Sequence, residues 1–237
     1  PRAIRDVYKR QQWERGHLMP AMQRFAAHGS KYGQLTLFMV PLGIAINFIA
    51  GQIVLLLKLP VYMDAIGTIL VGAVCGPLPG ALVGLLTNLI NAITLPTLVP
   101  YAIVSVLIGL AAGWLARVGW FRNVFHVAFA ALIFALIGGF IGSLITIWVF
   151  GGLSASGVGW VTGILRSLGV GETAAVYLAS MPLDFIDKVP SAFIAWLIIL
   201  RMPTRVLVKL PLGDRYLKPP KKHDALADAQ TVSYTHL

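Results

Sequence analysis

Two short stretches of the chain place charged residues directly beside long apolar runs. Asp64 lies in PVYMDAIGT (Pro60–Thr68), between IVLLL and ILVGAVCG, and Asp184, Asp187 and Lys188 lie in DFIDK, where another apolar run begins. Charges next to hydrocarbon are costly and persist mainly in a protein interior or a wet cavity. Carboxylates and an ammonium group in such a place could bind a small polar molecule.

Polar residues at the ends of the other apolar runs extend this group. We expect them to converge at one depth and to line an outward-facing pocket for a small polar solute. Acids and a lysine together suit a zwitterion or a heterocycle with donors and acceptors. Tyr101, Thr146 and Trp148 fall at the same predicted depth. The candidate substrate-binding residues are Lys58, Tyr62, Asp64, Asn88, Asn91, Asp184, Asp187 and Lys188.

Each of these residues also has a structural explanation. Asp184 and Lys188 are four residues apart and could pair with each other on one helix. Asp64 begins a predicted helix, where the helix dipole favours a carboxylate. Asn88 could form a hydrogen bond between helices. Aromatic residues such as Trp148 could stack on a flat solute, but they are also typical of the interfacial belt of membrane proteins.

Motifs for catalysis, nucleotides or metals do not accompany these residues. The chain contains neither G-x-x-x-x-G-K-[ST] nor H-E-x-x-H, and GVGETA (Gly169–Ala174) lacks the preceding strand of a phosphate loop. His126 stands alone, and Ser143 and Ser191 have no His and Asp nearby in the sequence. We therefore expect a protein that is not an enzyme and that uses no metal or cofactor.

The composition indicates which elements must position the polar residues. The chain is 57% hydrophobic and 12% charged, whereas soluble domains are about a quarter charged. No Asp, Glu, Lys or Arg occurs between Asp64 and Arg117 or between Arg122 and Arg166. Continuous apolar runs, without the alternation of a barrel, predict an all-α integral membrane protein. The single cysteine, Cys75, excludes an internal disulfide.

Apolar runs and turn residues predict a six-helix bundle. CGPLPG (Cys75–Gly80) indicates a tight turn between the second and third spans. A surface helix is expected near Trp160–Leu168, and a helical lead-in at Thr173–Ser180 is expected to break at Pro182. The predicted spans are Leu35–Leu57, Tyr62–Cys75, Gly80–Ile93, Tyr101–Ala116, Val124–Phe150 and Leu183–Leu200.

The distribution of Lys and Arg predicts how the chain is oriented in the membrane. The formal net charge is +10, and the basic residues gather at the two ends and in one central loop, at Arg117 and Arg122. Under the positive-inside rule, an even number of spans then puts both termini in the cytoplasm. We divide the chain into a cytoplasmic segment at 12–34, a membrane domain at 35–203 and a basic cytoplasmic tail at 204–231.

Both ends of the chain resemble a sequencing-library scar. DVYKRQ (Asp6–Gln11) and VSYTH (Val232–His236) match translations of the transposase mosaic-end adapter and of its reverse complement. We interpret residues 1–11 and 232–237 as adapter sequence and exclude them from the fold. The alternative is that they are genuine tails.

The residues quoted above carry a resemblance to a known family. Asn47–Ile93 and Asp184–Pro203 together resemble the substrate-binding (S) component of energy-coupling factor transporters, which are bacterial vitamin importers. The resemblance spans Leu35–Pro203 and rests on P-x-Y-x-D-x-x-G-T, the G-P-x-x-G turn and the D-K at the last span.

This resemblance implies a multi-pass protein of the bacterial cell membrane that binds a water-soluble vitamin or precursor near the outer face. It implies partners, namely one transmembrane coupling subunit and two cytoplasmic ATPase subunits, together with membrane lipid and no nucleic acid. Lys58–Tyr62 would act as a gate over the site. The alternative is a membrane sensor or partner-recruiting module; a stand-alone carrier is disfavoured, because no internal repeat or mid-membrane charge is evident.

One feature of the family is missing. The A-x-x-x-A pair that docks the coupling subunit is absent, because Ile49 follows Ala45 at the fourth position. Gly43, Asn47 and Gly51 form a small-residue stripe that could replace it. Similar stripes occur at Gly80/Gly84, Gly109/Gly113 and Gly138/Gly142, and such stripes serve either packing inside a bundle or contact with a partner subunit.

Overall fold

The computed structural model describes residues 33–57, 59, 61–154 and 157–217. The candidate Lys58 lies outside these residues, as do both interpreted scars, positions 12–32 and positions 218–231. Within the described part every regular element is a helix, which confirms the all-α prediction there. The elements are α2 (Gln34–Leu56), α3 (Ile66–Cys75), α4 (Pro77–Asn91), η1 (Pro96–Leu98), α5 (Ala102–Val118), η2 (Trp120–Arg122), α6 (Val124–Leu136), η3 (Ile137–Ile141), α7 (Gly142–Phe150), α8 (Gly157–Ser167), α9 (Glu172–Arg201), α10 (Thr204–Leu207) and η4 (Gly213–Tyr216).

Two described helical runs are long and apolar enough to cross a membrane, judged by length and composition. They are Gln34–Val54 in α2 and Val124–Phe150, which combines α6, η3 and α7. The exterior of the bundle is apolar as well: the exposed fractions of Leu37, Phe125 and Trp148 are 77%, 72% and 84%. A soluble monomer rarely exposes an apolar surface of this extent.

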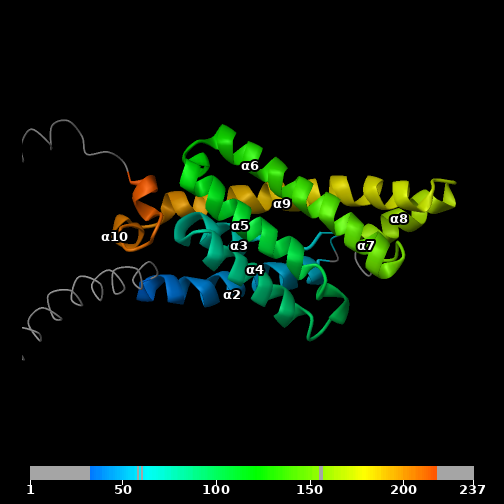
Figure 1. Ribbon diagram of the computed structural model, residues 1–237, viewed down its shortest axis with the longest axis horizontal. Helices are drawn as coiled ribbons and strands as arrows, with labels where there is room; N and C mark the ends of the chain where they lie inside the picture. The colour runs from blue at the N-terminus through cyan, green and yellow to red at the C-terminus, as the bar shows by residue number, and fades with distance from the viewer. Residues whose placement is uncertain (1–32, 58, 60, 155–156, 218–237) are drawn as a thin grey trace, which may run out of the picture.

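Helix α3 lies at the centre of the bundle, between α2, α4, α5 and α9 (Figure 1). Every residue of α3 is buried. Its hairpin with α4 turns at the single residue Gly76, whose φ of +107° favours glycine. Pro77 then opens α4 at a position where no backbone N–H is needed. The tight turn was therefore predicted, but α4 begins at Pro77 and not at Gly80.

Small-residue stripes allow α4 and α5 to pack closely. Gly80 and Gly84 of α4 lie against Gly109 and Ser105 of α5, and a methyl group added to Gly109 would overlap the backbone of Gly80. Close backbone approach of this kind is the usual role of small residues at helix interfaces in membranes. These two stripes therefore serve packing inside the bundle.

The stripe on α2 also faces the bundle. Gly43 packs against Gly67 of α3. Asn47 is fully buried; its Nδ2 donates to Thr68 Oγ1 at 2.9 Å and to Thr87 Oγ1 at 3.1 Å, and its Oδ1 accepts from the Gly67 N–H. Gly51 is half-buried. A partner that docks on α2 would therefore have to contact other residues of that helix.

Helix α9 corrects the predicted break at Pro182. It runs for 30 residues through both Pro182 and Pro190, so the predicted lead-in and the last span form one helix. Each proline removes one backbone hydrogen bond. Helix α9 packs against α3, α6 and α8, and contacts of this kind allow membrane helices to tolerate proline. The predicted surface helix corresponds to α8.

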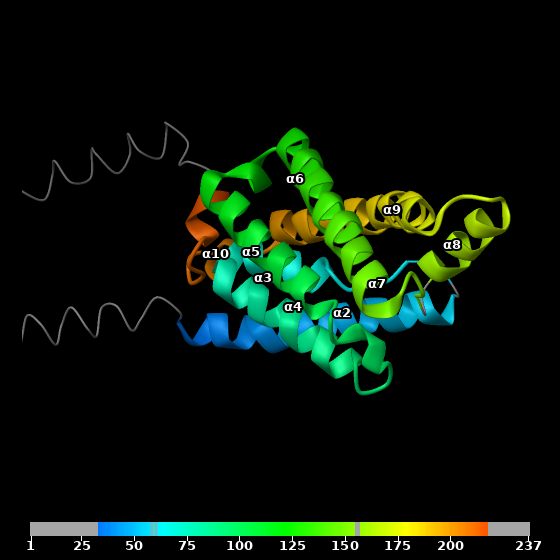
Figure 2. The same cartoon turned by 45° about the vertical axis from the view of Figure 1, so that its right-hand side comes forward.

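The start of α2, the end of α9 and α10 lie at one end of the bundle, and α8 lies at the other (Figures 1 and 2). Beyond α9 the chain folds back onto this first end. The N–H of Leu212 donates to the Val74 carbonyl at 3.0 Å, and the Tyr216 hydroxyl donates to the Ala73 carbonyl at 2.9 Å. Residues 204–217, predicted as part of a tail, therefore pack against the end of α3.

The Asn47 cluster yields a stability prediction. Replacing Asn47 by Ala leaves a buried backbone N–H and two hydroxyls without a partner, so Asn47→Ala should lower the free energy of unfolding by roughly 1–3 kcal/mol. Unfolding of the purified protein in detergent measures this. Gln52→Ala, at an exposed position of the same helix, is the control and should change little. Equal stability of Asn47→Ala and wild type would contradict the prediction.

Candidate functional site

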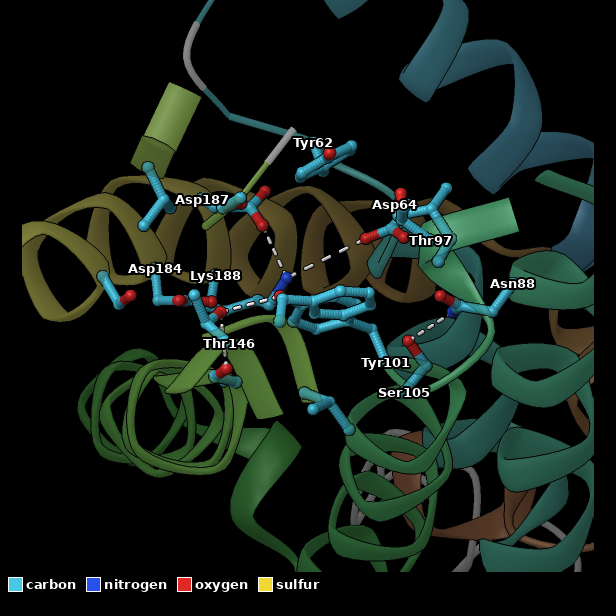
Figure 3. Close-up of a pocket in the computed structure, with 18 of the residues that line it drawn as sticks. Tyr62, Asp64, Asn88, Thr97, Tyr101, Ser105, Thr146, Asp184, Asp187 and Lys188 are labelled. Atoms are coloured by element: carbon cyan, nitrogen blue, oxygen red, sulfur yellow. Dashed lines mark hydrogen bonds and ion pairs between the residues drawn. The ribbon is translucent and has the colours of Figure 1, made fainter. Parts of the chain in front are cut away.

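A cavity of about 440 Å³ lies toward the α8 end of the bundle, where Val158 of α8 is part of its lining. It is enclosed by the loop before α3, by α4, η1 and α5, by η3 and α7, by the segment around α8, and by α9 (Figure 3). Its polar lining residues are Tyr62, Asp64, Asn88, Thr97, Tyr101, Ser105, Thr146, Ser154, Ser180, Asp184, Asp187 and Lys188.

Most of the predicted binding residues line this one cavity. Tyr62, Asp64, Asn88, Asp184, Asp187 and Lys188 are all brought together there, although they come from three distant parts of the chain. Asn91 does not line it: this residue ends α4 beyond the cavity, and its carbonyl accepts a hydrogen bond from Thr94 Oγ1 at 2.9 Å.

Lys188 is the centre of a buried ion-pair network. Its Nζ pairs with the carboxylate of the neighbouring Asp187 and lies 3.9 Å from Asp64 Oδ1 (Figure 3). The side chains of Lys188 and Asp187 are only 7% and 6% exposed. Among the described residues no cation lies within ion-pair distance of Asp184, so the expected alternative of an Asp184–Lys188 pair is not the one formed.

Asp187 also holds the loop that enters α3. Its Oδ1 accepts a hydrogen bond from the Met63 backbone N–H at 2.8 Å. Met63 has a φ of +47°, which is uncommon for a residue with a side chain. Such conformations persist where surrounding contacts determine them. Two such contacts hold Met63: its own hydrogen bond to Asp187, and the ion pair that the next residue, Asp64, forms with Lys188.

Asp184 lies on α9 one turn before Lys188, next to η3. Its carboxylate sits against Gly138 in η3, where a methyl group would overlap it. A π-helical turn such as η3 is rare and occurs frequently at functional sites. Within the described part of the chain no hydrogen-bond donor is bonded to the Asp184 carboxylate, which leaves this group available to a solute.

Asn88 is also only partly satisfied by the protein. The side chain is 2% exposed, and its Nδ2 donates to Ser105 Oγ at 2.6 Å and to the Gly84 carbonyl at 3.1 Å. Asn88 therefore forms a hydrogen bond between helices α4 and α5, which was the structural alternative to a binding role. Its Oδ1, however, accepts from no donor among the described residues, and the cavity is open to it.

Two stacked aromatic rings form one wall of the cavity. The rings of Tyr101 and Phe150 stack with their centroids 5.9 Å apart and their planes 7° apart. The Tyr101 hydroxyl lies 2.7 Å from Thr146 Oγ1, which itself donates to the Gly142 carbonyl, so Tyr101 is the donor to Thr146. This wall offers a flat apolar surface to a ring-shaped solute.

Sequence reasoning did not select several of these residues. Tyr101 and Thr146 were placed at the right depth without being chosen as contacts, and Ser105 and Thr97 were not considered. Small hydroxyl residues are common in membrane helices, so their type alone gives no signal. Trp148 and Trp160 are 84% and 81% exposed, away from the cavity, which fits the belt and not stacking on a solute.

The side chains that line the cavity can form ion pairs, hydrogen bonds and ring contacts with a small molecule. The lining combines carboxylates, an amide, hydroxyls and an aromatic wall, and the described residues contain no group of His, Cys, Asp and Glu able to hold a metal ion. Comparisons with family models, with curated proteins and with solved structures find no match to this chain. Inference about its function therefore depends on the geometry of the site.

The Lys188 network yields the second prediction. Lys188→Met keeps the length of the side chain but leaves buried carboxylates unpaired, which should cost about 3–5 kcal/mol of unfolding free energy. Adding Asp187→Asn should restore part of this loss, because one unpaired charge is removed. Unfolding in detergent, followed by tryptophan fluorescence, measures both variants.

Arg166→Met is the matched control for this prediction. Arg166 pairs with Glu172 at 3.3 Å, but these side chains are 44% and 42% exposed, and exposed pairs contribute less than about 1 kcal/mol. If the two single variants lost the same stability, the Lys188 network would not have the structural role given to it here.

Proposed function

We propose that the protein is the substrate-binding component of an energy-coupling-factor-type importer, and that it binds a small, water-soluble, vitamin-like solute in the cavity. The observation that carries the proposal is the cavity itself, which has the size and the mixed apolar and polar lining of a small-molecule site. Tyr62 and Asp64 reach it from PVYMDAIGT, and Asp184 and Lys188 reach it from DFIDK. The motifs behind the family resemblance thus supply the lining.

The proposal includes six membrane spans with both termini in the cytoplasm of a bacterial cell. It is supported by the arrangement of α2, α3, α4, α5, the α6–α7 run and α9, because α2 begins and α9 ends on the same side of the bundle (Figure 2). Basic residues favour that side as the cytoplasmic one. Arg166 lies at the other end, whereas the α10 end holds Arg117, Arg122, Arg201, Arg205, Lys209 and Arg215.

Transport in this proposal requires partners, because the chain has no nucleotide motif to use ATP. A transmembrane coupling subunit and two cytoplasmic ATPases would supply the energy. The outward face of α2 is our proposed docking surface, since Gly43 and Asn47 are buried. The exposed residues of this face follow a helical stripe at Leu42, Ala45, Ile49, Ile53 and Leu56.

Ligand-induced stabilisation of the purified protein in detergent tests the proposal. We expect at least one compound in a panel of vitamins and their precursors to raise the melting temperature. A ligand at a thousand times its dissociation constant stabilises the folded state by about 4 kcal/mol. Stabilisation should be lost in Gly142→Leu, because Gly142 lines the cavity and no atom lies within 4 Å of an added Cβ.

Gly163→Leu is the matched control for the cavity-filling variant. Gly163 also has open space at its Cβ, but it lies on α8 outside the cavity lining, so this variant should respond to the ligand as wild type does. A flat panel with wild-type protein would count against a solute site and favour a membrane sensor or partner-recruiting module. Equal responses of the two leucine variants would place the ligand elsewhere.

A further inference from the structure

The charges that line the cavity do not balance. Three carboxylates, from Asp64, Asp184 and Asp187, face the single ammonium group of Lys188 among the described lining residues. Lys188 is occupied, because it pairs with Asp187 and lies within ion-pair distance of Asp64. The described lining therefore holds more acidic than basic groups, and among the described residues no cation lies within ion-pair distance of Asp184.

An unpaired carboxylate is costly where the surroundings have a low dielectric constant, and a cation that binds beside it removes that cost. Asp187 does not have this need, because it also accepts the Met63 N–H. Asp184 does, because no described donor is bonded to its carboxylate, which lies against the glycine Gly138 of η3. The vacant interaction at Asp184 is therefore one for a positive charge.

A second vacant acceptor lines the same cavity, at Asn88. Asn88 is 2% exposed, and its Oδ1 has no donor among the described residues while its Nδ2 is used by Ser105 and Gly84. Figure 3 shows Asn88 and Asp184 on opposite sides of Tyr101. The molecule that fills both positions therefore needs a donor for Asn88 and a positive charge for Asp184.

We propose that the solute is an organic cation with a flat ring. Its positively charged nitrogen pairs with Asp184, its ring lies against Tyr101, and an N–H or O–H group donates to Asn88. A cation beside an aromatic face gains a further attraction from the ring. This inference rests on the proposed function, since it assigns a chemical class to the solute of that same cavity.

Matched ligand series test the charge requirement with wild-type protein in detergent. Pyridoxamine, pyridoxine and 4-pyridoxic acid share one ring and differ at one substituent, which is cationic, neutral or anionic. 1-Methylnicotinamide, nicotinamide and nicotinate form a second series, and thiamine, riboflavin and biotin represent larger solutes. In any series that binds, we expect the cation to bind roughly 10–100-fold more tightly than its neutral counterpart, because only the cation forms an ion pair with Asp184.

Variants then assign the preference to Asp184. Asp184→Asn should remove most of the preference for the cation, whereas Asp184→Glu should retain it. Glu172→Gln is the matched control, because Glu172 lies on the same helix but is exposed and paired with Arg166 outside the cavity. If Asp184→Asn does not fold, the wild-type series and Asp184→Glu still decide.

The possible results separate the inference from the function on which it rests. Binding of a neutral or anionic member as tightly as the cation would overturn the charge assignment and leave the solute site intact. A cation preference that survives Asp184→Asn would overturn the role of Asp184. The absence of binding by every compound would count against the proposed function, and the inference would fall with it.

Discussion

The arrangement of the site depends on one constraint: an ammonium group inside an apolar bundle has to be paired. Lys188 meets it with Asp187 on its own helix and with Asp64 on the loop before α3. Because α3 is the central, fully buried helix, this network fixes α9 relative to the core. The same network forms part of the cavity lining, so the requirement to pair Lys188 and the candidate site involve the same residues.

Much of the fold could be predicted because charge is so scarce in this chain. The uninterrupted run from Val124 to Phe150 and the helix after Gln34 follow from composition alone. The break predicted at Pro182 was wrong, since the rule for proline describes an isolated helix and α9 has neighbours along its length. The start of α4 was also predicted wrongly, because we read Pro77 as part of a turn. Proline is well tolerated as the first residue of a helix, and α4 begins there.

The site was predictable to the extent that its residues are charged. Asp64, Asp184, Asp187 and Lys188 stand out against apolar sequence, and all four line the cavity. Asn91 is the same residue type as Asn88 and lies three positions later. It is the last residue of α4 and lies beyond the cavity, whereas Asn88 lines it, and the sequence pattern did not separate the two. The sequence did not indicate that hydroxyl groups such as that of Ser105 line the cavity. Their role depends on which helix packs against them, and the glycine stripes of α4 and α5 determine that packing.

The charged turn of α9 lies between two prolines, and this position has a physical consequence. Pro182 and Pro190 cannot donate to the carbonyls one turn before them, at Leu178 and Ile186. The helix is therefore weakest on both sides of Asp184–Lys188, while the turn itself is held by Asp64 and Met63. The contacts of this turn with Asp64 and Met63, together with the packing of α9 against α3, α6 and α8, offset the two missing backbone hydrogen bonds.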